Sequence, residues 1–141
     1  MAWQRAGLGR GGRHFTRPET REWEELVGWY GRQAMAGREL LTGPVELLVV
    51  FQLPIPASWP QWKRALAAEG KVACTAKPDW DNLGKGVGDA LNGVVWADDA
   101  QVVDAFTRKR YGDPCAIVYV KPLDLLPAQV SRRPTREEGA R

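Results

Sequence analysis

Residues 77–104 read KPDWDNLGKGVGDALNGVVWADDAQVVD, and they hold six aspartates without a glutamate. Apolar residues recur here at helical spacing, which predicts a helix over 79–93 with Asp79 as its N-cap. The VVWADD turn follows this helix and can fold back toward its start. The stretch therefore predicts a helix and a turn that together gather acidic side chains.

The segments on both sides of this unit predict two more helices and three strands. Residues 45–53 are rich in Val and Leu, which is typical of a short, largely buried strand. Residues 101–111 and 115–121 also read as strands, and the Gly-Asp-Pro segment 112–114 between them predicts a hairpin. The two helices are indicated by capping spacing, apolar periodicity and terminal glycines (Thr16, Glu19, Trp23, Leu26, Val27, Tyr30, Ala34 and Gly37; Ser58, Gln61 and Gly70).

The order helix, strand, helix, helix, strand, strand indicates an α+β fold. In such a fold we expect helices to pack on a small mixed, largely antiparallel sheet. A chain of 141 residues fits one domain. We expect that domain over residues 1–128, with residues 1–17 as a basic arm rich in Gly and Arg. Residues 129–141 are polar, and we expect a disordered tail there.

Composition excludes several classes of protein. No apolar run reaches the ~20 residues of a membrane-spanning helix, and the N-terminus lacks the apolar region of a secretory signal. Cys74 and Cys115 form no C-x-x-C pair, and a single histidine, His14, argues against a His-rich metal site or a Ser-His-Asp triad. We expect a reduced, cytoplasmic protein without a membrane partner. Most of the seven tryptophans are expected to be core or packing residues, with Trp3 and Trp80 as exceptions near charged candidates.

Charge is distributed unevenly along the chain. Residues 77–104 carry a net charge of −4, whereas residues 1–38 and 105–141 carry +3 and +4. Basic flanks attract polyanions, and an acidic cluster repels them unless a divalent cation lies between. A solvated charged surface is the alternative for each run taken alone.

The aspartates are spaced so that several carboxylates can meet. Asp79 and Asp81 lie two residues apart where an extended segment enters the helix, so both can converge on one point. Asp81, Lys85 and Asp89 lie four residues apart and share one helix face. The opposite face is an apolar stripe of Leu83, Val87 and Leu91.

Carboxylates crowded at one site repel one another and cost stability. A hard divalent cation removes this cost, and Mg²⁺ prefers oxygen ligands. Such a site supplies a Lewis acid, a metal-activated water and a lysine beside the reacting phosphate. The pattern therefore indicates chemistry on a phosphate group with Mg²⁺, for which Mn²⁺ is the expected substitute.

Each of these residues also has a structural role that competes with catalysis. Asp79 suits an N-cap, and Asp81 complements the helix dipole. Lys85 is placed to pair with the acids four residues away on either side. Asp98 and Asp99 are typical turn residues. Pairing along the helix leaves Asp79, Asp98 and Asp99 without a balancing charge.

The pattern K-P-D-x-D-N-L-x-K-x-x-x-D-A-L-N-G-V-V-x-x-D-D-x-Q-V over residues 77–102 resembles the RusA-type Holliday-junction resolvases, small Mg²⁺-dependent endonucleases of bacteria and their prophages. The N-terminal segment W-Q-R-A-x-x-x-x-G-G-R-H-F-T-x-P-x-T-R-x-W-E is similar to the family's basic loop and first helix. The resemblance implies a RusA-like α+β fold and a homodimer with one active site per subunit. It implies the catalytic set Asp79, Asp81, Lys85 and Asp99, the metal ligands Asp79, Asp81, Asp99 and Asp98, and the secondary residues Asp89, Asn82 and Gln101.

The resemblance further implies that the protein resolves four-way DNA junctions by paired symmetric nicks, through attack of a metal-activated water on phosphodiesters. Two alternatives stay open: a less selective metal-dependent nuclease of branched DNA, and a non-catalytic junction-binding dimer. Basic residues of the flanks would follow the phosphate backbone without reading bases. These expected DNA contacts are Arg5, Arg10, Arg13, Arg17, Lys77, Arg108, Lys109 and Arg110.

The chain departs from the family pattern at its start. Relatives begin with an apolar strand before the W-Q-R segment, whereas Met1-Ala2 leads directly into that segment here. We expect either that the strand is lost, which leaves one edge of the sheet open, or that the true start lies upstream.

Overall fold

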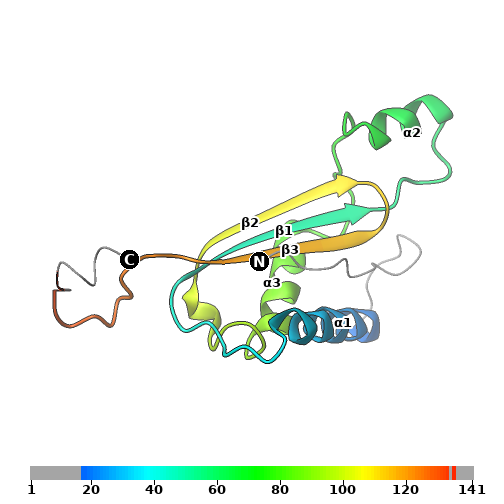
Figure 1. The fold of residues 1–141 in the computed structure, drawn as a ribbon. Helices are drawn as coiled ribbons and strands as arrows, with labels where there is room; N and C mark the ends of the chain where they lie inside the picture. The colour runs from blue at the N-terminus through cyan, green and yellow to red at the C-terminus, as the bar shows by residue number, and fades with distance from the viewer. Residues whose placement is uncertain (1–16, 134, 136–141) are drawn as a thin grey trace.

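The computed structural model describes residues 17–133 and 135 of the chain, with the side chains of residues 17–21 left out of the description. Helices, one 3₁₀ turn and strands alternate along it, which confirms the predicted α+β class (Figure 1). The elements are α1 Arg17–Met35, β1 Val45–Leu53, α2 Gln61–Ala68, α3 Trp80–Leu91, η1 Asp99–Gln101, β2 Val102–Tyr111 and β3 Cys115–Pro122.

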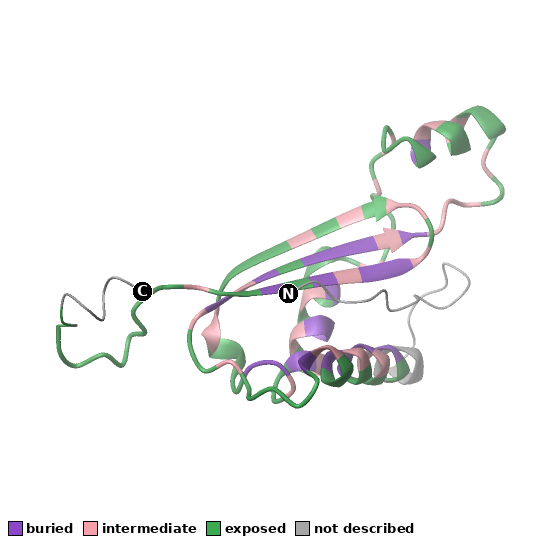
Figure 2. Cartoon of the chain, in the orientation of Figure 1, coloured by how far each residue is buried: buried purple, intermediate pink, exposed green. Residues whose placement is uncertain are grey.

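The sheet is mixed, with the strand order β2-β1-β3. β1 runs parallel to β2 and antiparallel to β3, so the predicted hairpin between the last two strands is wrong. The short 112–114 connection instead passes over the end of β1, where the Gly112 amide donates to the carbonyl of Leu53 at 2.9 Å. β1 is rich in Val and Leu and mostly buried, so it takes the centre, whereas the polar β2 takes an edge (Figure 2).

Helices α1 and α3 lie together on one face of the sheet (Figure 1). They approach closely because glycines face the partner helix at two positions. A Cβ added to Gly86 would lie 3.0 Å from the ring of Trp23, and one added to Gly28 would lie 3.3 Å from the carbonyl oxygen of Ala90. The buried side chains of both helices and of β1 form one core with Trp96, which is fully buried.

The predicted boundaries of the helices hold, except at the start of α2. Pro60 is its N-cap and no side chain caps it, so the expected cap by Ser58 is wrong. Proline suits this position because its fixed φ is compatible with a helix start and it has no amide to satisfy. Thr16, the expected cap of α1, lies outside the described residues. No helix among those the structure describes is long and apolar enough to cross a membrane.

Candidate active site

The entry to α3 places Asp79 at the N-cap position in an extended conformation. Its carboxylate makes no capping hydrogen bond. Both of its oxygens instead accept from Nζ of Lys77, at 2.9 and 3.0 Å. The carboxylate of Asp79 is thus turned away from the helix backbone, and the purely capping role weighed from the sequence is not the one it has.

Helix α3 presents the predicted polar face to solvent along its length. Asp81, Lys85 and Asp89 are all exposed, and Asn82 is exposed beside them. The ion pairs found among residues 17–133 and 135 do not include Lys85, so the expected pairing along the helix is not formed. The ammonium group of Lys85 is therefore available on the same face as the carboxylate of Asp81. The opposite stripe of Leu83, Val87 and Leu91 is buried, as predicted.

Asp98 has the structural role that the sequence left open. Its side chain accepts from the amide of Ala100 at 2.9 Å, and its own amide donates to Oε1 of Gln101 at 2.8 Å, which together form a capping box around η1. Gln101 also donates through Nε2 to the carbonyls of Leu41 and Gly43, at 2.7 and 2.9 Å. These contacts hold the acidic turn against the segment that leads into β1.

Asp99 is attached to the core by a residue that the sequence analysis did not single out for function. Nε1 of Trp96 donates to Oδ1 of Asp99 at 2.7 Å. The indole of Trp96 is fully buried while Asp99 is exposed, so a rigid group orients a carboxylate that reaches solvent. The position of Trp96, three residues before Asp99 in a tight turn, was the available signal.

The acidic turn folds back onto α3, but it reaches the second half of the helix and not its start. A Cβ added to Gly88 would lie 4.0 Å from Oδ1 of Asp99, and one added to Gly84 would lie 3.2 Å from Oγ1 of Thr107 in β2. The two glycines thus let the turn and β2 approach one side of α3. Lys85 lies between these two glycines in the chain and is exposed.

The donor set fits a hard cation by its chemistry. Asp79, Asp81 and Asp99 offer exposed carboxylate oxygens, and Mg²⁺ takes only one or two protein carboxylates together with water and substrate phosphates. In the part of the chain that the structure describes, no three His, Cys, Asp or Glu side chains form a group able to hold a metal ion. The carboxylates therefore suit an ion shared with a phosphate more than one held in a protein cage.

The basic residues expected to contact DNA do not form one patch in β2. Lys109 lies on the helix-covered side of the sheet and donates to the carbonyl of Ala76. Arg108 and Arg110 lie on the other side, where Nε of Arg110 donates to Oε1 of Gln52 at 2.8 Å. The side chain of Arg17 at the start of α1 is not described. Arg5, Arg10, Arg13, Trp3 and His14 lie outside the described residues.

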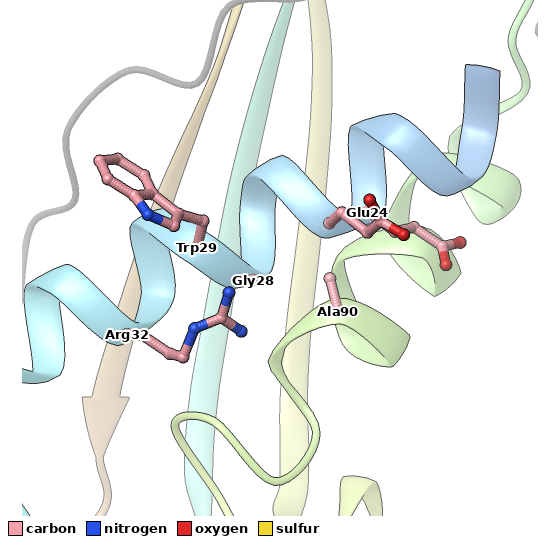
Figure 3. Close-up of a pocket in the computed structure, with 6 residues that line it drawn as sticks. Glu24, Gly28, Trp29, Arg32 and Ala90 are labelled. Atoms are coloured by element: carbon pink, nitrogen blue, oxygen red, sulfur yellow. The ribbon is translucent and has the colours of Figure 1, made fainter. Parts of the chain in front are cut away.

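A shallow pocket between α1 and α3 is separate from these acids. It is lined by Glu24, Gly28, Trp29, Arg32 and Ala90, together with Glu25 (Figure 3). None of these is a predicted site residue, and Ala90 belongs to the side of α3 that packs on α1. The candidate site is therefore the exposed face of α3 with the Asp98-Asp99 turn.

Comparison with known proteins relates this chain to one family and to one curated protein. The family model of the endodeoxyribonuclease RusA matches residues 1–121. The uncharacterized protein YqaN of Bacillus subtilis (strain 168) is 42% identical over 76 residues, which are 52% of this chain and 54% of YqaN. The chain thus spans about half the length of this curated relative.

Proposed function

The chain belongs to the RusA endodeoxyribonuclease family, and on this basis we propose that it is a Mg²⁺-dependent endonuclease that resolves four-way DNA junctions. The observation that carries the proposal is that two charged side chains of α3 lack the structural roles expected from their positions. Asp79 sits at an N-cap without capping the helix, and Lys85 forms none of the ion pairs found in the described ranges. The capping role of Asp79 and the helix pairing of Lys85 are thus unfilled. Lys85 is open to a ligand, and the carboxylate of Asp79 is paired with the exposed Lys77 and not with the helix backbone.

In the proposed reaction, Asp79, Asp81 and Asp99 would share Mg²⁺ with a phosphate of the bound DNA, with Asp98 nearby. Without DNA, the Asp99 turn lies against the second half of α3, and the described carboxylates form no closed metal cage. Held by these residues, Mg²⁺ would supply Lewis-acid chemistry and would lower the pKa of a coordinated water. Lys85 stabilises the negative charge that develops on the phosphoryl oxygens. Trp96 keeps the Asp99 carboxylate in one orientation through its N–H donor. Hydrolysis adds water across a phosphodiester bond and leaves a phosphate and a hydroxyl at the nick.

The proposal includes a homodimer, because a four-way junction has two-fold symmetry and resolution needs two nicks. The sheet face opposite α1 and α3 supports this part. Leu48 of β1 pairs with Phe106 of β2 and with Tyr119 of β3, so the three form one exposed apolar row across the sheet. No helix among the described residues covers it.

Charge on this face is arranged for self-association. An acidic pair, Glu46 and Asp104, lies two residues before the apolar row along β1 and β2, with Lys121 of β3 next to Glu46. Arg108 lies two residues after the row, so the two ends carry net charges of −1 and +1. A two-fold axis through the row would place the acidic end of one copy against the basic end of the other. This complementarity favours a second copy of the chain as the partner of this face.

Cleavage of a four-way junction tests the proposal. The purified chain is incubated with a four-way junction, with a forked or flapped DNA and with a linear duplex of the same sequences, with and without Mg²⁺. We expect symmetric paired nicks in the junction alone, and only with Mg²⁺. Equal cleavage of forks and flaps would support the less selective nuclease, and binding without nicks would support the non-catalytic dimer.

A further inference from the structure

The segment between β1 and α3 stands out from the body of the molecule. Residues 54–78, called here the α2 projection, carry α2 beyond the ends of β1 and β2 (Figure 1). Within α2 only Ala67 is buried. The projection ends next to Asp79, so the segment that follows α2 leads directly into the candidate active site.

The root of the α2 projection is fastened to the end of β2. The ring of Trp59 packs edge-on against Tyr111, with 5.2 Å between ring centroids. Partial burial raises the pKa of the Tyr111 hydroxyl, and Cys74 adds to this shift through its charge and a hydrogen bond. Nζ of Lys109 donates to the carbonyl of Ala76. Both ends of the projection are thus held, while α2 itself stands in solvent.

The two tryptophans of the projection are used differently. Trp59 packs on Tyr111 at the end of β2. Nζ of Lys63 lies over the ring of Trp59, 3.9 Å from its centroid, in a cation–π contact. Trp62 is 66% exposed, so most of its indole contacts water. Trp80, between Asp79 and Asp81, is 68% exposed. The expectation that most tryptophans are core or packing residues is thus wrong for Trp62, whereas Trp80 was expected to be an exception.

The projection is also basic. It holds four basic residues and one glutamate, a net charge of +3, and the adjoining residues 79–104 have a net charge of −5. Two of the basic residues, Lys63 and Arg64, follow Trp62 directly on α2. An exposed indole beside cationic groups fits nucleic acid, because the cations attract the phosphate backbone while the ring offers a stacking surface.

We propose that the α2 projection contacts DNA and that Trp62 stacks on a base exposed at the branch point, which makes Trp62 a determinant of selectivity for branched DNA. This inference rests on the proposed function. In a linear duplex both faces of each base are covered by its neighbours, whereas strands that exchange partners expose bases. Stacking on Trp62 is thus available only at a branch, while the cations of the projection attract either DNA.

Binding by three variants tests this inference in the Asp81→Asn background, which keeps the DNA intact. Trp62→Ala removes the ring, Trp62→Phe keeps an aromatic surface, and Trp29→Ala is the control. Trp29 is a matched residue because it is 48% exposed and lies on α1 (Figure 3). Affinity is measured for a four-way junction and for a linear duplex at the same salt concentration, and thermal unfolding confirms that each variant folds.

We expect Trp62→Ala to weaken junction binding by roughly 5- to 150-fold, the range for loss of one stacked base. Binding to the duplex should change less than twofold. Trp62→Phe should restore most of the junction affinity, and Trp29→Ala should match its parent. A 2-aminopurine placed at the branch point should be quenched by the parent and by Trp62→Phe, but not by Trp62→Ala.

Other results would overturn the inference in distinguishable ways. If the parent prefers junctions and Trp62→Ala keeps that preference, the inference fails while the proposed function stands. Equal losses on junction and duplex would make Trp62 a general DNA contact and would also overturn it. A parent that binds both DNAs equally would contradict the proposed selectivity and, with it, the role assigned to Trp62.

Discussion

Nε1 of the buried Trp96 donates a 2.7 Å hydrogen bond to Oδ1 of the exposed Asp99. The bond joins the hydrophobic core to the candidate active site through a single rigid side chain. Trp23 offers a contrast, because its Nε1 is also buried but has no hydrogen-bond partner in the described part of the chain. Substitution of each tryptophan by phenylalanine therefore separates two effects: both variants lose core volume, but only the Trp96 variant loses a hydrogen bond to Asp99.

Trp96→Phe should slow junction cleavage by roughly 10- to 100-fold, the usual cost of removing a group that orients a ligand. The rate should also need more Mg²⁺ to saturate, because the Asp99 carboxylate is no longer held in place. Single-turnover cleavage against Mg²⁺ concentration measures both effects. Trp23→Phe is the control for lost volume, and an equal change in its Mg²⁺ dependence would contradict the orienting role.

Asp79→Asn, Asp81→Asn and Asp99→Asn should each abolish cleavage, since Asn keeps the shape of the side chain and removes its charge. Asp79→Asn should cost little stability, because its carboxylate caps no helix and its exposed pair with Lys77 is worth only about 0–1 kcal/mol. Nicking assays and chemical denaturation measure the two effects. Near wild-type nicking by Asp81→Asn would refute the assigned role.

Lys85→Ala should lower the maximal cleavage rate by roughly 10²- to 10³-fold, as expected for loss of one transition-state donor. Its Mg²⁺ dependence should change little, and its stability should stay within about 0.5 kcal/mol, since Lys85 is an exposed surface residue. Cleavage under saturating enzyme separates rate from binding. A variant with weak DNA binding and a normal maximal rate would make Lys85 a binding residue instead.

Replacement of two glycines of α3 by alanine should change the stability of the protein in opposite directions. Gly88→Ala has room for the new Cβ and should stabilise the protein by about 0.4–1 kcal/mol through a less flexible unfolded chain. Gly86→Ala places its Cβ 3.0 Å from the packed ring of Trp23, and such overpacking typically costs about 1–3 kcal/mol. Urea denaturation measures both. A Gly86→Ala protein as stable as Gly88→Ala would show that α1 can move away.

Phe106→Glu should dissociate the proposed dimer, because it places a charge in the apolar row with Leu48 and Tyr119. Light scattering at several concentrations should then give the mass of one chain, while the unaltered protein gives twice that mass. Trp29→Glu, at a comparably exposed aromatic residue on α1, should leave the dimer intact. A wild-type protein that is monomeric and still makes paired nicks would refute the symmetry argument.

Local patterns in the sequence determined the elements that carry the site. The apolar run 45–53 matches β1, and the periodicity after Asp79 placed α3 with its buried stripe and its exposed face of Asp81, Lys85 and Asp89. These properties depend on neighbours in the chain, because backbone propensity and side-chain periodicity act within a few residues. The motif within residues 77–102 likewise identified the family without any contact being known.

Only the tertiary structure decided which strands pair and which side chains far apart from the local patterns form hydrogen bonds and ion pairs. Whether β3 pairs with β2 or with β1 depends on which strand is apolar enough to occupy the centre of the sheet. The more apolar β1 takes this place, so β3 pairs with β1 although β2 precedes it in the chain. The tertiary structure likewise decided which partners the acidic residues have. Asp98 caps η1, Asp79 pairs with Lys77, and Asp99 accepts a hydrogen bond from Trp96. It also decided that Trp62 lies in solvent. Each of these outcomes is set by burial and hydrogen-bond satisfaction across the whole fold, and such non-local terms leave no local mark in a sequence.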